Sequence, residues 1–203
     1  SQAWSPPPRP GPFKKMQTPP NPPPPPWTIL SLITWTADYF ETRQVENPRA
    51  SAEVLLAETL GCDRIHLYVR FDQPLQEDEL ARFKGLIKRR VQGEPVAYIT
   101  GRRGFWTLDL AVSESVLIPR PETECLVEAA LALLPNDAAN GSRRVLDLGT
   151  GSGAIVLALA AERPGHRFFA SDRSPDALIQ AQGNAARTSI VFFCSDWFDA
   201  IRP

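Results

Sequence analysis

The segment that decides the fold runs Val145-Leu146-Asp147-Leu148-Gly149-Thr150-Gly151-Ser152-Gly153-Ala154. Its first four residues predict an apolar strand that carries an acid near its end, and the next five form a glycine-rich turn. The apolar stretch 154–163 then predicts a helix. Glycines let the backbone turn tightly and let a ligand lie against main-chain N–H groups, while the start of a helix favours a carboxylate or phosphate. The segment therefore predicts a cofactor site in an α/β fold.

The sequence on either side predicts the opening of a parallel α/β sheet. Further strands are expected at 167–171 and 190–194, in alternation with the glycine turn and its helix. Upstream, an amphipathic helix containing Leu126 and Leu134 ends before the polar loop 136–142. Between residues 98 and 112 the apolar period changes towards two, which predicts a hairpin or a short pair of strands.

The residues before this domain divide into a helical part and a proline-dense tail. Apolar residues at helical spacing behind Thr28, a suitable N-cap, predict a first helix, and similar stripes follow it. Proline is dense from Pro6 to Pro26, so this tail is expected to be disordered, with an SH3-type ligand as the alternative. The expected domains are a tail over 1–26, a helical bundle over 27–93, a hairpin and connecting segment over 94–122, and the first half of the α/β domain over 123–203.

Composition and charge exclude several classes of protein. A formal net charge of -1 gives no basic field that would attract nucleic acid, and the basic run 88–90 is interpreted as a solvated helix end. The 3 cysteines lie far apart without a C-x-x-C pair, which argues against a zinc knuckle or a disulfide scaffold and favours a reducing cytoplasm. His66 and His166 have no acidic or cysteine partner at metal-ligand spacing, so no metal is expected. No apolar run approaches the roughly 18 residues of a membrane span.

Two cofactors compete for the glycine-rich turn. Gly149, Gly151 and Ala154 also satisfy the G-x-G-x-x-G/A fingerprint of dinucleotide sites, and Asp172 could accept hydrogen bonds from ribose hydroxyls in either case. A carboxylate at Asp147 suits the ammonium group of S-adenosylmethionine, whereas a pyrophosphate would repel it.

A third strand ends in Ser195-Asp196-Trp197, at the same edge of the predicted sheet. Asp196 could hold the adenine amino group of a cofactor and Trp197 could pack on the base. The alternative is that Asp196 only caps a turn and Trp197 only fills the core.

Four motifs in order make the sequence similar to a known family. They are Gly93-Glu94-Pro95-Val96-Ala97-Tyr98-Ile99-Thr100-Gly101, Leu117-Ile118-Pro119-Arg120-Pro121-Glu122-Thr123-Glu124, Asp147 to Gly153, and Ser195-Asp196-Trp197. Together they resemble the HemK-type release factor glutamine methyltransferases, from about Trp27 to Pro203.

The resemblance implies a helical domain that holds a peptide-chain release factor and a Rossmann-like class I methyltransferase domain that binds S-adenosyl-L-methionine. The methyl group would pass to the glutamine of a Gly-Gly-Gln loop in the release factor, a cytoplasmic protein that acts in translation termination. By motif, the cofactor would contact Asp147, Gly149, Thr150, Gly151, Ser152, Gly153, Asp172, Asp196 and Trp197. Arg120, Pro121 and Glu122 would lie on the substrate side.

In that family the next element is a strand that ends in Asn-Pro-Pro-Tyr, whose asparagine and proline carbonyl orient the glutamine amide. The sequence ends at Pro203 with only three strands of the α/β domain, and Asn21-Pro22-Pro23-Pro24 follows no strand. We therefore expect no catalytic residue within residues 1–203 and an inactive fragment. The alternatives are an adenine-N6 nucleic-acid methyltransferase, a non-catalytic cofactor-binding or partner-binding module, and a nicotinamide-dependent oxidoreductase.

Overall fold

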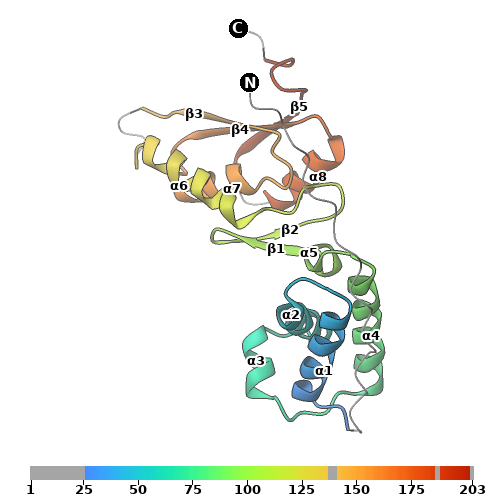
Figure 1. Cartoon of the computed structure of the whole chain (residues 1–203). Helices are drawn as coiled ribbons and strands as arrows, with labels where there is room; N and C mark the ends of the chain where they lie inside the picture. The colour runs from blue at the N-terminus through green and yellow to red at the C-terminus, as the bar shows by residue number, and fades with distance from the viewer. Residues whose placement is uncertain (1–25, 137–140, 186–187, 202–203) are drawn as a thin grey trace, which may run out of the picture. The chain divides into compact units, whose positions relative to one another are not determined.

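The chain folds into two compact units that divide between Val96 and Ala97. The computed structural model describes residues 26–136, 141–185 and 188–201. The proline-dense segment 1–25, for which the sequence predicts disorder, lies outside the described residues. Each unit has its own apolar core, so each is described by itself (Figure 1).

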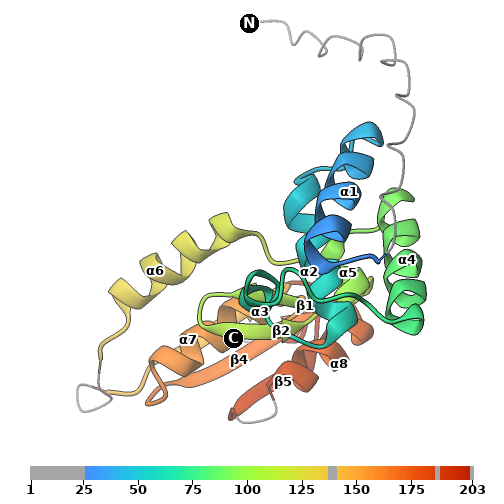
Figure 2. The same ribbon diagram turned by 90° about the horizontal axis from the view of Figure 1, so that it is seen from below.

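The first unit is helical, as its apolar stripes predict. Its helices are α1 (Ile29–Thr42), α2 (Pro48–Leu60), α3 (Arg64–Val69) and α4 (Glu77–Val91), and α1, α2 and α4 lie side by side in Figure 2. Thr28 caps α1 as expected: its side chain accepts the Ser31 N–H at 3.3 Å, and the Ser31 hydroxyl accepts the Thr28 N–H at 2.9 Å. Gly61 ends α2 with φ +61°, a left-handed conformation that favours glycine.

A charged residue is buried between α2 and α3. Glu53 is 2% exposed and accepts hydrogen bonds from the Tyr68 hydroxyl at 2.5 Å, from Arg49 Nε at 3.0 Å and from Arg64. Burial on its own would raise the pKa of this carboxyl, but the hydrogen bonds and the two guanidinium charges outweigh it and hold the pKa below its ordinary value. Glu53 therefore ties α3 to α2 through charge.

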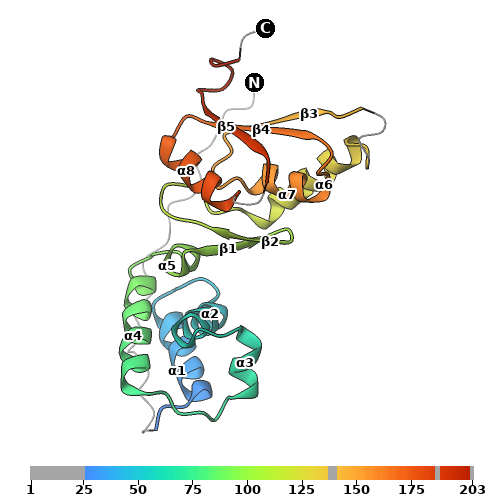
Figure 3. The same ribbon diagram turned by 180° about the vertical axis from the view of Figure 1, so that it is seen from behind.

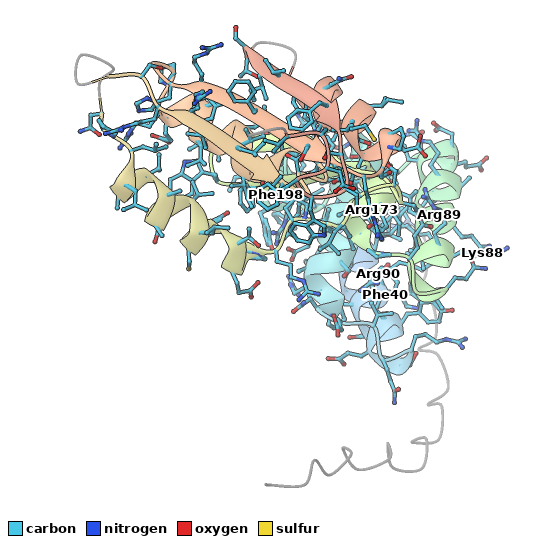
Figure 4. All side chains as sticks on the ribbon, turned by 90° about the horizontal axis from the view of Figure 1, so that it is seen from above. Phe40, Lys88, Arg89, Arg90, Arg173 and Phe198 are labelled. Atoms are coloured by element: carbon cyan, nitrogen blue, oxygen red, sulfur yellow. The ribbon has the colours of Figure 1, made fainter. Side chains whose placement is uncertain are left out.

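The basic run at the end of α4 has structural partners. Arg89 forms an ion pair with Glu94, and Arg90 donates to the Glu94 carbonyl at 3.2 Å and to the Glu46 carbonyl at 3.3 Å (Figure 4). The sequence predicts a solvated helix end here. The structure adds that the arginines also fasten the loop between α1 and α2 and the loop that follows α4.

A short helix, α5 (Val96–Thr100), and a hairpin precede the sheet of the second unit. Residues 98–100 were expected in the β-prone stretch, but they are helical. The predicted hairpin is confirmed: β1 (Arg102–Phe105) pairs antiparallel with β2 (Leu108–Ala111). Trp106 lies in the turn with φ +56°, donating its backbone N–H to Glu124 Oε1 at 2.9 Å and its ring N–H to Glu162 Oε1 at 2.8 Å. Two acids thus fasten the hairpin turn to the α/β core.

The sheet is parallel, as the sequence predicts, with the order β3-β4-β5. Its strands are β3 (Arg144–Leu148), β4 (Arg167–Asp172) and β5 (Ile190–Cys194), joined by α7 (Ala154–Glu162) and α8 (Pro175–Asn184). A 3-10 turn (Pro121–Thr123) and α6 (Glu124–Leu133) come before β3. The helix α8 lies in a stretch for which the sequence patterns predicted no helix.

The described helices of this unit lie on one face of the sheet (Figures 1 and 3). Val156 and Ala158 of α7 are fully buried there against Phe168 and Ala170 of β4. On the opposite face Leu146 is 37% exposed and Val191 is 55% exposed. The sheet therefore buries one layer of side chains among the described residues, and the loops at its carboxyl end remain accessible.

Candidate functional site

The site is built from the loops that follow the three parallel strands. Parallel strands bring their carboxyl ends to one edge of a sheet, and in open α/β folds ligands bind there. Leu148 of β3 is paired with Ser171 of β4, so the glycine turn begins where β4 is about to end. The backbone N–H groups of Gly149 and Thr150 both donate to the Ser171 carbonyl at 2.9 Å. The turn is therefore anchored to the neighbouring strand.

The turn requires glycine for conformation and for space. Gly149, Gly151 and Gly153 have φ values of +71°, +54° and +83°, a region that other residues rarely adopt. A Cβ at Gly153 would also lie 3.0 Å from Leu157 Cδ1 and 3.3 Å from the Ala181 Cβ. The third glycine therefore lets α7 begin close against α8, and it places the start of α7 beneath the turn.

Asp172, the acid at the end of β4, is fixed towards the glycine turn. Its Oδ2 accepts the Gly151 N–H at 2.9 Å, and its Oδ1 accepts the Ser174 N–H at 3.0 Å. Each carboxylate oxygen has two lone pairs, so both oxygens can accept one more donor, such as a ribose hydroxyl. The carboxylate is thus held in place before any ligand arrives.

Asp147 lies under the turn and is half-buried. The Thr150 hydroxyl donates to its Oδ2 at 2.8 Å. Burial raises the pKa of the Asp147 carboxyl, and the charge of Asp172 adds to that effect; the hydrogen bonds from Thr150 and from the Val156 N–H oppose it. A half-buried carboxylate whose pKa is raised is suited to a cationic ligand group, which would stabilise its ionised form.

A pocket of about 350 Å³ opens between these loops, a size within the range of small-ligand sites. Its walls come from all three strand ends: Gly149, Asp172, Arg173, Ser195, Asp196 and Trp197. Trp197 is 69% exposed, so the alternative in which it fills the core is wrong. Asp196 does accept the Asp199 N–H through its backbone carbonyl at 3.1 Å, but it also lines the pocket.

Sequence reasoning missed two of the pocket residues. Arg173 directly follows Asp172 at the end of β4 (Figure 4), and it lines the pocket. Ser195 organises the loop after β5: its hydroxyl donates to the Trp197 carbonyl at 3.0 Å and accepts the Ala200 N–H at 3.1 Å. Its backbone N–H also donates to the Asp172 carbonyl at 3.1 Å. Arg173 follows Asp172 and Ser195 precedes Asp196, and these neighbouring positions could have indicated that both residues belong to the pocket.

The remaining predicted residues fall into two groups. Asp147, Thr150, Gly151, Ser152 and Gly153 form the turn and its support without lining the pocket itself. Arg120, Pro121 and Glu122 are exposed at the start of the 3-10 turn and do not line the pocket.

The helical unit has a larger groove, of about 670 Å³, between α1 and α4. Trp27, Trp35 and Tyr39 line one side, and Lys84 and Lys88 line the other. Among the described residues that line it there is no carboxylate and no glycine turn, so the chemistry of a nucleoside cofactor fits the smaller pocket better.

Neither a metal site nor a membrane span is found among the described residues. No group of three or more His, Cys, Asp and Glu side chains is placed to hold a metal ion there. His166 is engaged structurally, since its Nδ1 accepts the Arg143 N–H at 3.1 Å. None of the helices within 26–136, 141–185 and 188–201 combines the length and the apolar character needed to cross a bilayer.

Fold and site together define a helical domain followed by a methyltransferase-type α/β domain. The family profile described as the PrmC N-terminal domain matches residues 31–101, and one described as a methyltransferase domain matches residues 139–201. Relatives named release factor glutamine methyltransferase cover most of the chain. That of Rhodopirellula baltica is 41% identical over 88% of this chain and 62% of its own length, and that of Escherichia coli is 48% identical over 77% and 56%.

The chain is similar to the release factor glutamine methyltransferases, and it spans 62% and 56% of the length of these two relatives. Among solved structures, the N-terminal domain of human METTL16 in complex with SAH aligns over 80% of this chain and 58% of that one. The identity is 19% and the TM-score 0.39, too loose a likeness to support an argument about the site.

Proposed function

We propose that residues 123–203 carry the S-adenosyl-L-methionine site of a release factor glutamine methyltransferase. One observation carries the proposal. The Asp172 carboxylate is held by the Gly151 N–H at 2.9 Å and shares one pocket with Gly149, Asp196 and Trp197. A glycine turn, a fixed acid and an acid–aromatic pair are the groups that an amino-acid-bearing nucleoside requires.

The residues present fit this cofactor part by part. Asp172 would accept the ribose hydroxyls, because its oxygens keep free lone pairs. Asp196 would accept the adenine amino group, and the exposed ring of Trp197 would pack on the base. The turn from Gly149 to Gly153 would lie against the amino-acid part. When bound, the cofactor supplies an electrophilic methyl group on a sulfonium.

A half-buried acid distinguishes this cofactor from a dinucleotide. Asp147 lies beneath the turn, bonded to Thr150, and its ionised form would attract the ammonium group of S-adenosyl-L-methionine. The same charge would repel a pyrophosphate. An oxidoreductase that uses a nicotinamide cofactor is therefore the weaker candidate.

The substrate proposal rests on the relatives and on the helical unit. A release factor would be the partner, methylated on the side-chain amide of its Gly-Gly-Gln glutamine in the cytoplasm, before it acts in translation termination. The helical residues 27–93 would help to hold it, and Arg120, Pro121 and Glu122 would lie on the substrate side. A net charge of -1 disfavours the adenine-N6 nucleic-acid alternative.

Calorimetric titration of the purified chain with S-adenosylhomocysteine and, separately, with NAD tests the cofactor. We expect saturable binding of S-adenosylhomocysteine only. Binding of NAD without S-adenosylhomocysteine would overturn the cofactor assignment.

Biolayer interferometry tests the partner, with purified release factor and an adenine-containing DNA duplex as competing candidates. We expect the chain to bind the release factor. Binding of the duplex without the release factor would favour the nucleic-acid alternative.

A further inference from the structure

Asn184, the last residue of α8, joins two segments that are distant in the sequence. Its Nδ2 donates to the Ser152 carbonyl in the glycine turn at 2.9 Å and to the Ala111 carbonyl at the end of β2 at 2.9 Å. Its Oδ1 accepts the Ala111 N–H at 2.9 Å. One side chain therefore contacts the turn and the hairpin at once.

The two bonds with Ala111 imitate the pairing of a neighbouring strand. The side-chain amide offers an N–H and a C=O in one plane, and Ala111 offers both of its backbone groups in return. The second amide hydrogen then remains for Ser152. Among side chains of this length only asparagine has two donors and an acceptor on one planar group; aspartate, of the same shape, has no donor when ionised.

The bond with Ser152 fixes the last peptide of the glycine turn. The Ser152 carbonyl belongs to the same peptide plane as the Gly153 N–H, which donates to the Thr150 carbonyl at 2.8 Å. Asp172 fixes the previous part of the turn through the Gly151 N–H. The backbone of the glycine turn beside the pocket is thus held by one side chain from β4 and by another from α8.

A neighbouring contact supplies a matched control. One turn earlier on α8, Gln180 Oε1 accepts the Ser113 hydroxyl at 3.0 Å. This bond also ties α8 to the segment that leaves the hairpin. Neither residue of the pair forms a hydrogen bond with the glycine turn.

We propose that Asn184 is a positioning residue that couples the glycine turn to the hairpin and holds the turn ready for its ligand. The proposal rests on the proposed function for the identity of that ligand. Because β2 leads directly towards residues 113–122, the same amide also fixes the beginning of the segment that carries Arg120 and Glu122.

The experiment compares the wild-type chain with Asn184→Ala, Asn184→Asp and Gln180→Ala. Calorimetry measures the affinity for S-adenosylhomocysteine, and thermal melting measures stability. We expect Asn184→Ala to weaken binding about tenfold, the effect of losing about one net hydrogen bond that orders the turn. Asn184→Asp should weaken it at least as much, because a carboxylate would face the Ser152 and Ala111 carbonyl oxygens. Gln180→Ala should keep the affinity within about twofold even where its melting temperature falls.

Amide hydrogen exchange without ligand separates this proposal from the proposed function. The Gly151 and Gly153 amides should exchange faster in Asn184→Ala than in Gln180→Ala. Equal exchange in the two variants, or equal affinity where the wild type binds, would overturn the role of Asn184. If neither the wild-type chain nor any variant binds S-adenosylhomocysteine, but the amides exchange faster in Asn184→Ala than in Gln180→Ala, the cofactor assignment fails and the positioning role stands.

Discussion

Replacement of Asp172 is the most direct test of the pocket. In Asp172→Ala two acceptors are lost, one for the Gly151 N–H at 2.9 Å and one for the Ser174 N–H at 3.0 Å. The hydrogen bonds proposed with the ribose are lost with them. A hydrogen bond to a charged group contributes about 1.5 to 3 kcal/mol, so affinity for S-adenosylhomocysteine should fall about ten- to a hundredfold.

Two further variants separate the causes of that loss. Asp172→Asn keeps one acceptor oxygen and removes the charge, so its affinity should lie between those of the wild type and the alanine variant. Asp176→Asn removes the same charge from an exposed position in the first turn of α8 and should leave the affinity unchanged. Isothermal titration calorimetry at fixed pH measures all four proteins. Wild-type affinity in Asp172→Ala would remove Asp172 from the site and contradict the reasoning.

Three other predictions concern separate parts of the chain. Trp197→Ala should weaken S-adenosylhomocysteine about three- to tenfold by calorimetry, because an exposed ring contributes by stacking; an unchanged constant would contradict that role. The affinity should also fall as pH drops through the raised pKa of Asp147, whose ionised form would hold the ammonium group, and Asp147→Asn should lose this dependence. Glu53→Ala should lower the free energy of unfolding by about 1.5 to 3 kcal/mol in urea titrations, since Tyr68, Arg49 and Arg64 lose the carboxylate that accepts their hydrogen bonds. The pKa of Glu53 is lower in the folded chain than in the unfolded one, so its contribution to the free energy of unfolding is fully present above the ordinary carboxyl pKa. That contribution is lost as the pH falls through the lowered pKa. Glu53→Gln should lack this loss of stability at low pH.

The sequence predicted features whose signals are local. Alternation of apolar strand, glycines and apolar helix identified β3 and α7, and proline and glycine at the two ends marked α2. Asp196 and Trp197 could be placed because the carboxyl ends of parallel strands share an edge. For α8 the signals were also present, with Ser174 as N-cap and proline at the first position, but its short sequence with an internal glycine gives a weak apolar stripe.

Other features depend on residues that meet only after folding. The amide of Asn184 contacts a backbone group 73 positions away, and no spacing rule connects the two. Trp106 continues an apolar run that predicts a strand, yet it turns with φ +56° because Glu124 and Glu162 bind its two N–H groups. In both cases distant hydrogen bonds decide the local structure, so the local sequence cannot indicate them.

The position of β3 at one side of the described sheet has a consequence for how the pocket can be completed. Open α/β sheets bind ligands at a topological switch point, where neighbouring connections leave a strand pair in opposite directions. A strand laid along the free side of β3 would create such a point beside Gly149, with its own carboxyl end next to the glycine turn. The residues after that strand would then reach the reactive end of a ligand whose nucleoside end rests on Asp172 and Trp197. In such an arrangement, recognition of the proposed cofactor and use of its methyl group would lie on the two sides of a single strand.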